Sequence, residues 1–192
     1  VTMAVKAGFS NQGQICLCGS RLFIQDEIYE KFKKALLEKV SKLKVGDPQD
    51  DGMDLGAVVS EEHMNKVLSK ITQAKKIGGN ILTGGNRKLI EGDLLNGYYI
   101  EPTVIENLPF DCEVNQEEIF GPVLTLIPFK DEEEVINMAN STKYGLSASI
   151  FTENISKGHR VAAAIKSGVV WINTWLLSCL LYTSPSPRDN GR

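Results

Sequence analysis

The feature that most limits the folds open to this chain is a regular alternation of helix-type and strand-type segments. In some stretches apolar residues recur every third or fourth position, while others are short apolar runs of strand length. This alternation is typical of parallel sheets covered by helices. The sequence therefore predicts an α/β fold with a mostly parallel sheet flanked by helices. In such sheets functional residues gather at the carboxyl ends of the strands.

Helical spacing marks several segments, and their ends carry capping or breaking residues. Ser60 is placed to cap one helix, and Gly78 follows its last turn. Asp131 and Glu134 have the spacing of a capping box at the start of another. The expected helices cover residues 1–9, 26–45, 60–77, 131–139 and 154–166. The positions expected to face inward include Ile28, Phe32, Leu36, Val40, Leu43, Met64, Val67, Leu68, Ile71, Ala74, Val135, Ile136 and Ala139.

Strand-type segments separate these helices. One of them contains Pro102, which limits how that segment pairs with its neighbours. The expected strands or extended segments are residues 20–25, 80–83, 98–105, 123–129, 146–152 and 168–173.

The two ends of the chain differ from the rest in their sequence patterns. The first residue is Val1, and no capping residue precedes the first helical pattern, so we expect that helix to begin upstream. Residues 178–192 follow no helical or strand period, and their Ser-Pro-Ser-Pro core does not fit a helix interior. Their amino-acid sequence resembles translated sequencing-adapter read-through. We interpret them as a non-native tail, with an ordinary disordered tail as the alternative.

Composition and charge exclude several classes of function. The net charge is −3 and no basic run is interleaved with aromatics, which argues against nucleic acid as a partner. The apolar stretch at residues 169–182 is shorter than the roughly 20 residues of a membrane-spanning helix, so no membrane segment is expected.

The four cysteines are interpreted as free thiols in a reducing, cytoplasmic compartment. An even count leaves disulfides as the alternative, but Cys16 and Cys18 are too close for an easy mutual bridge. We expect no metal site, because there is no C-x-x-C pair and His63 and His159 have no partners at ligand spacing.

Residues 9–16 (FSNQGQIC) are the segment most indicative of chemistry. Gly13 stands three residues before Cys16, and a glycine there lets the backbone turn sharply and approach a ligand. A cysteine held on such a turn at a site edge can act as a thiolate nucleophile. The alternative is a buried cysteine serving as a small apolar residue.

A second segment, residues 117–123 (EEIFGPV), places a carboxylate and an aromatic ring just before an apolar strand. Taken alone, it also fits a solvated glutamate pair beside a core phenylalanine. Three shorter segments follow the same order along the chain. They are residues 97–103 (GYYIEPT), 144–146 (YGL) and 171–173 (WIN).

Together, these five segments resemble the aldehyde dehydrogenase family in order and spacing, over residues 1–177. The resemblance implies that Cys16 is the catalytic nucleophile. It also implies that Glu118 binds the hydroxyls of the nicotinamide ribose and that Phe120 packs against the cofactor. His63 and Lys66 match positions that reach the same ribose in some members, although they fit a solvated helix face equally well.

The resemblance also implies a substrate and a cofactor. Ile15, Leu17 and Asn173 are expected to line the substrate pocket, and the cofactor is expected to be NAD, with NADP as the alternative. Residues 15–18 together with residues 175–177 (WLL) look similar to family members that oxidise muconic-type semialdehydes. The substrate expected is thus a small-molecule aldehyde that is oxidised to a carboxylic acid through a cysteine thioester.

Other parts of the family's machinery are expected outside this chain. We interpret residues 1–177 as a partial catalytic domain, because the family's general-base glutamate and its cofactor domain precede the cysteine motif. The fragment alone is therefore expected to be inactive, and its full-length parent to be a homo-oligomer. The alternatives are an acylating semialdehyde reductase, and a non-catalytic paralogue or interaction fragment.

Overall fold

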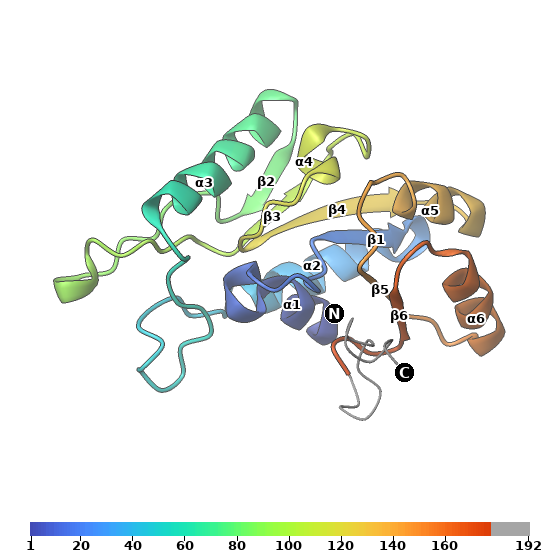
Figure 1. Cartoon of the computed structure of the whole chain (residues 1–192), viewed down its shortest axis with the longest axis horizontal. Helices are drawn as coiled ribbons and strands as arrows, with labels where there is room; N and C mark the ends of the chain where they lie inside the picture. The colour runs from blue at the N-terminus through green and yellow to red at the C-terminus, as the bar shows by residue number, and fades with distance from the viewer. Residues whose placement is uncertain (178–192) are drawn as a thin grey trace, which may run out of the picture.

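The structure is a computed structural model that describes residues 1–177. Helices and strands alternate along most of this part of the chain (Figure 1). The helices are α1 (Thr2–Phe9), α2 (Tyr29–Val40), α3 (Glu61–Lys76), α4 (Glu113–Gln116), α5 (Glu132–Ala139) and α6 (Ile155–Ala164). The strands are β1 (Arg21–Gln25), β2 (Asn80–Thr83), β3 (Thr103–Glu106), β4 (Val123–Phe129), β5 (Ser147–Ile150) and β6 (Val169–Ile172). Short 3-10 turns cover Ser10–Gly13, Asp26–Ile28 and Gly92–Leu94.

Four strands form the large sheet, in the order β1-β4-β3-β2. The β1–β4 and β3–β4 pairs are parallel, and β2 joins the edge antiparallel to β3. The parallel register pairs Arg21 with Thr125 and Thr103 with Val123, so segments entering β1 and β4 approach the same edge.

Both faces of the large sheet are buried, which explains why β4 is an almost continuous apolar run. Neighbouring residues on a strand point to opposite faces. Leu124 packs toward α1 and α2, and Val123 packs toward α3. On β3, Val104 and Ile105 divide in the same way. Figure 1 shows α3 on one side of this sheet and α1 and α2 on the other.

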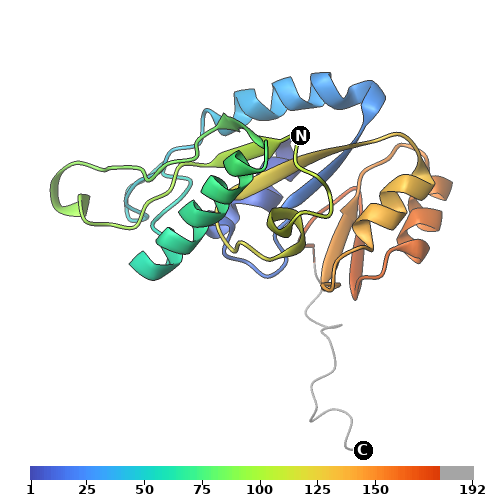
Figure 2. The same ribbon diagram turned by 90° about the horizontal axis from the view of Figure 1, so that it is seen from above.

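A separate small sheet consists of β5 and β6, which pair in parallel. Together with α5 and α6 it forms the orange and red part of the molecule beside the large sheet (Figures 1 and 2). The α/β class and the mostly parallel pairing predicted from the sequence are confirmed. The division into two sheets was not predicted.

Local sequence signals placed several boundaries correctly. Strands β2 and β4 have the predicted limits. The Ser60 hydroxyl accepts the His63 N–H at 3.1 Å, and Asp131 accepts the Glu134 N–H at 2.9 Å, as capping residues do. The Glu134 carboxylate accepts the N–H of Lys130, one residue before the cap.

One predicted inward-facing residue is exposed, and in α5 the buried residue is another than those predicted. Ile28 is 51 % exposed, because a 3-10 turn precedes α2 and the helix begins only at the next residue. In α5 the buried residue is Met138, whereas Val135 and Ile136 are half-buried.

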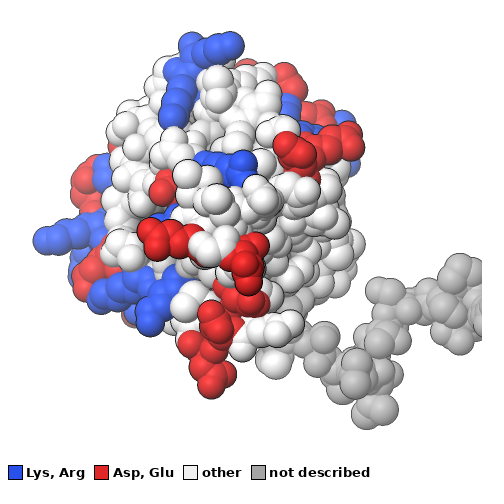
Figure 3. All heavy atoms as spheres, turned by 90° about the vertical axis from the view of Figure 1, so that its left-hand side faces the viewer, with Lys and Arg blue, Asp and Glu red and all other residues white. Residues whose placement is uncertain are grey.

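Within residues 1–177, no helix is long and apolar enough to cross a membrane. The interpretation of residues 178–192 as a non-native tail falls outside the described residues. On the face drawn in Figure 3, basic and acidic side chains are interspersed.

Candidate active site

The segment after α1 has an unusual backbone. Asn11, Gln12 and Gly13 have φ angles of 50°, 56° and 70°, so three successive residues lie in the left-handed region. A Cβ on Gly13 would come within 2.1 Å of the carbonyl oxygen of Gly121. Gly13 is therefore required both by its own conformation and by the close approach of the segment before β4.

Residues Ile15–Cys18, here named the cysteine turn, follow directly. The Cys18 N–H donates to the Ile15 carbonyl at 2.9 Å, which makes Cys16 and Leu17 the two central residues of a β-turn. Cys16 is exposed. The turn thus presents the Cys16 thiol to solvent, as a nucleophile requires and a core cysteine does not.

The chain on both sides of the cysteine turn is anchored. On one side the Gln14 N–H donates to the Asn11 carbonyl at 2.9 Å, and on the other the Gly19 N–H donates to the Ala7 carbonyl at 3.1 Å. The second bond fixes the exit of the turn to α1. The position of Cys16 is consequently set by its backbone surroundings.

The second thiol of the turn is held differently. Cys18 is half-buried, and its Sγ lies 3.9 Å from the Ser10 carbonyl oxygen. Burial raises the pKa of the Cys18 thiol; a backbone hydrogen bond opposes this, and the nearby Cys16 and Glu118 charges raise the pKa further. Cys18 therefore stays protonated more readily than an ordinary cysteine. Cys18 also lines a cleft together with Glu118.

The segment before β4 packs against both the cysteine turn and α3. Phe120 has a φ of 56°, and its carbonyl oxygen lies 2.6 Å from His63 Nε2. The His63 and Phe120 rings also meet edge to face, with centroids 6.2 Å apart. Gly121 lies so close to α3 that a Cβ there would come within 2.8 Å of the Val67 side chain. His63 thus fixes the backbone that carries Phe120.

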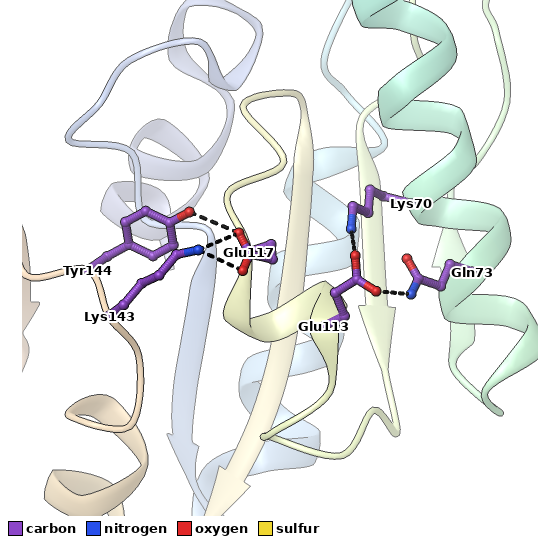
Figure 4. Close-up of polar contacts among 6 residues, drawn as sticks. All are labelled: Lys70, Gln73, Glu113, Glu117, Lys143 and Tyr144. Atoms are coloured by element: carbon purple, nitrogen blue, oxygen red, sulfur yellow. Dashed lines mark hydrogen bonds and ion pairs between the residues drawn. The ribbon is translucent and has the colours of Figure 1, made fainter.

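Ion pairs link α4 and the residue after it, Glu117, to the loop before β5 on one side and to α3 on the other (Figure 4). Glu117 accepts hydrogen bonds from Lys143 at 2.8 and 3.0 Å and from Tyr144 at 3.1 Å. These bonds lower the pKa of Glu117. No hydrogen bond or ion pair within residues 1–177 engages the exposed Glu118. Of the two adjacent carboxylates, Glu118 is therefore the one available to a ligand.

Glu113, one helical turn earlier, makes the matching contact with α3. Its carboxylate pairs with Lys70 and accepts a hydrogen bond from Gln73 at 2.7 Å (Figure 4). Helix α4 is thereby clamped between α3 and the loop that precedes β5.

A small cleft joins the two segments. Its walls are Gly8, Gly13, Ile15, Cys18, Ser20, Glu118, Ile119, Phe120 and Gly121. The cysteine turn and the Glu118–Phe120 segment, a hundred residues apart in sequence, are therefore neighbours. Both come before a strand, at the amino ends of β1 and β4, so the prediction that such residues gather at carboxyl ends is wrong for them. They meet because parallel strands β1 and β4 are adjacent.

The other predicted site residues have different surroundings. Lys66 is exposed on α3 and Leu17 is half-buried in the cysteine turn. The Asn173 amide pairs with the backbone of Thr152, accepting at 2.9 Å and donating at 2.9 Å. Asn173 thus joins the ends of β5 and β6.

Trp175 is a site-region residue to which sequence reasoning assigned no role. It is 6 % exposed, and its indole N–H donates to the Leu17 carbonyl at 2.8 Å. No local pattern in the sequence could have paired residues 158 positions apart.

Two further predictions concern cysteine and metal chemistry. Cys16, Cys18 and Cys112 are free thiols, as predicted for the cysteines that the structure describes. Among residues 1–177, no three His, Cys, Asp or Glu side chains come together as a metal ion would need.

Comparisons with known proteins agree with this geometry. The model of the aldehyde dehydrogenase family matches residues 1–180. The chain is 44 % identical over 185 residues to a 2-aminomuconic semialdehyde dehydrogenase of Bos taurus, covering 92 % of this chain and 37 % of that protein. It is 42 % identical over 175 residues to a betaine aldehyde dehydrogenase of Vibrio vulnificus, covering 91 % and 36 %.

Solved structures show the same relationship. The crystal structure of betaine aldehyde dehydrogenase from Staphylococcus aureus in complex with NAD+ superposes with a TM-score of 0.88 at 40 % identity, covering 92 % of this chain and 35 % of that one. The chain thus spans somewhat more than a third of the length of the relatives it matches. Through its family-model match and its level of identity, this chain belongs to the aldehyde dehydrogenase family.

Proposed function

We propose that the complete protein carrying this chain oxidises an aldehyde to a carboxylic acid with NAD, using Cys16 as the nucleophile. The observation that carries the proposal is the exposed Cys16 thiol, on a turn whose Ile15 and Cys18 share a cleft with Glu118 and Phe120. A nucleophile beside an available carboxylate and an aromatic ring fits an aldehyde held against a nicotinamide. The likeness to a betaine aldehyde dehydrogenase solved in complex with NAD+ supports the choice of cofactor.

The residues present fit a nicotinamide dinucleotide. The Glu118 carboxylate is exposed and unengaged within residues 1–177, so it is free to accept hydrogen bonds from ribose hydroxyls. Phe120 offers a ring for packing, and His63 holds its backbone in place. Lys66, exposed one helical turn after His63, is a further contact on the same side. The cofactor, when bound, supplies the hydride acceptor, and NADP remains the alternative.

The chemistry of this chain's own residues then follows. The Cys16 thiolate attacks the aldehyde carbon, so that a C–S bond forms and the carbonyl π electrons move to oxygen. The backbone N–H of Cys16 donates no hydrogen bond within residues 1–177, so it is free to stabilise the oxyanion. Loss of hydride leaves a thioester on Cys16. Water then adds to the thioester, and the acid leaves as the C–S bond breaks.

The base that activates this water is proposed to come from outside these 192 residues. Of the two adjacent carboxylates that precede β4, Glu117 is paired with Lys143, and Glu118 is assigned to the cofactor. The isolated chain is accordingly expected not to turn over aldehyde, although its thiol is in place.

For the substrate, we propose a muconic-type semialdehyde. The support is the likeness to 2-aminomuconic semialdehyde dehydrogenases of mouse and cattle, at 42 % and 44 % identity. Leu17 and Ile15 would line the pocket from the cysteine turn, while Asn173 would shape it from the end of β6. We further propose that the complete protein is a cytoplasmic homo-oligomer that binds neither nucleic acid nor membrane. An acylating reductase is less well supported, because the family resemblance assigns Glu118 and Phe120 to the oxidising branch.

The test is Cys16→Ala in the complete protein, with NADH formation measured on a semialdehyde. Removing the nucleophile should lower the rate by about 10⁴-fold or more. Cys112→Ala is the matched control, since Cys112 packs at the core beneath α3 and should leave turnover close to the parent rate. Persistent NADH formation by Cys16→Ala would refute the assignment.

A further inference from the structure

The cysteine turn has an anchor outside the large sheet. The indole N–H of Trp175 donates to the carbonyl of Leu17 at 2.8 Å. Trp175 is 6 % exposed, so water competes little for this bond. A buried indole N–H usually finds some acceptor. Here that acceptor is the carbonyl of the residue directly after Cys16.

The approach of the chain to Trp175 is itself fixed. Asn173 has a φ of 58°, its N–H donates to the Ile150 carbonyl at 2.7 Å, and its amide pairs with the Thr152 backbone. These bonds turn the chain where it leaves β6. The end of the small sheet therefore positions Trp175 beside the cysteine turn.

Leu17 occupies the third position of the turn, between Cys16 and Cys18. The Leu17 carbonyl and the Cys18 N–H belong to the same peptide unit. The Cys18 N–H bond to Ile15 holds this unit from inside the turn but leaves its carbonyl end without a constraint. The Trp175 indole supplies that constraint. Without this bond, rotation of the Leu17–Cys18 peptide unit would change the backbone torsions of Leu17 and so the shape of the turn that carries Cys16.

We propose that Trp175 is a positioning residue for Cys16, acting through the carbonyl of Leu17. Its effect on turnover rests on the proposed function. Its effect on the geometry of the turn does not. Because a small displacement of a reacting group lowers turnover more than binding, losing the anchor should reduce kcat and leave KM nearly unchanged.

The experiment is Trp175→Phe in the complete protein, which keeps an aromatic ring and removes the donor. We expect kcat to fall about tenfold with KM within about twofold. We also expect hydrogen exchange of the Cys18 amide to accelerate about tenfold, because this amide closes the turn. Replacement of Trp175 by benzothienylalanine, which has sulfur in place of the N–H, gives the same readouts if Trp175→Phe fails to fold.

Tyr29→Phe is the matched control. It also removes one side-chain donor from an aromatic ring, the 3.0 Å bond to Glu106, but on α2 and away from the cleft. It should change neither kcat nor exchange at Cys18. The proposal is overturned if the Trp175 variants leave both quantities within about twofold of the parent, or change only one of them.

The two proposals can fail separately. If the complete protein oxidises no aldehyde, the proposed function is refuted. Exchange of the Cys18 amide then decides alone whether Trp175 holds the turn.

Discussion

The two sheets of this molecule are stabilised in different ways. In the large sheet every residue of β3 is buried, and Leu124 and Val104 on adjacent strands are fully inaccessible. In the small sheet each residue of β5 and β6 is at least partly exposed, and Val169 is 41 % exposed. The large sheet therefore has its own apolar core on both faces. The small sheet is a two-stranded parallel pair, an arrangement of marginal stability by itself.

Polar contacts compensate in the small-sheet region. Asn140 links α5 to the end of α6, donating to the Ala164 carbonyl at 2.9 Å and accepting the Lys166 N–H at 2.8 Å. Arg21, at the start of β1, donates to the Ala139 carbonyl at 3.3 Å at the end of α5. The position of the small sheet thus depends on a few directional bonds. The candidate site therefore lies between a part with a buried apolar core and a part attached through specific polar contacts.

The largest expected effect tests the packing difference directly. Leu124→Ala in β4 should lower the free energy of unfolding by about 3 kcal/mol, because it leaves a cavity between the sheet and α1. The same truncation at half-buried Ile150 in β5 should cost about 1 kcal/mol. Urea unfolding of the complete protein, followed by hydrogen exchange of the β4 and β5 amides, measures both. Equal costs would show that the small sheet has a core comparable to that of the large one.

Two glycine substitutions probe the same difference between the two regions. Gly13→Ala should lower the free energy of unfolding by about 2–3 kcal/mol, since it combines a φ of 70° with a contact of 2.1 Å to the Gly121 carbonyl oxygen. Gly168→Ala, before β6, should be close to neutral, because the nearest atom to its new Cβ would be 3.5 Å away. Thermal midpoints of the two variants provide the measurement. A harmless Gly13→Ala would contradict the close packing of the site.

The smallest expected effect is a pH dependence that belongs to the large sheet. Glu106, 7 % exposed at the end of β3, accepts hydrogen bonds from Tyr29, Lys33 and Asn80 at 3.0–3.1 Å. Burial opposes its charge, but these bonds outweigh burial, so that the pKa of Glu106 is lowered. Its stabilisation is therefore present above the unfolded-state pKa of about 4.3 and is lost as pH falls through the lower folded-state pKa.

Glu106→Gln should remove this dependence and cost about 1 kcal/mol near neutral pH. Urea midpoints at pH values on both sides of the window measure the change. Glu132→Gln is the control in the other region, because Glu132 pairs with Arg160 at an exposed position where solvent screens the charges. A parent-like acid dependence in Glu106→Gln would assign it to another group.

The candidate site was only partly predictable from the sequence. The motif resemblance singled out Cys16, Glu118 and Phe120, and the structure brings the segments that carry them to one cleft. The sequence did not reveal that Glu117 forms an ion pair with Lys143 or that His63 bonds to the Phe120 carbonyl. Nor did it reveal that the site lies at the amino ends of strands. Each of these facts depends on which strands become neighbours, and that is decided by the whole core.

The local structure follows from short stretches of the sequence. Ser60 and Asp131 began helices, the apolar run of β4 set a buried strand, and Gly13 permitted a backbone that other residues rarely adopt. These signals act over a few residues, because capping, periodicity and backbone sterics are short-ranged. Long-range packing, in contrast, is the reason that β2 runs antiparallel, that β5 and β6 form their own sheet, and that Trp175 bonds to Leu17. A hydrogen bond between distant residues has no local signature, since both partners are positioned by the packing of everything between them.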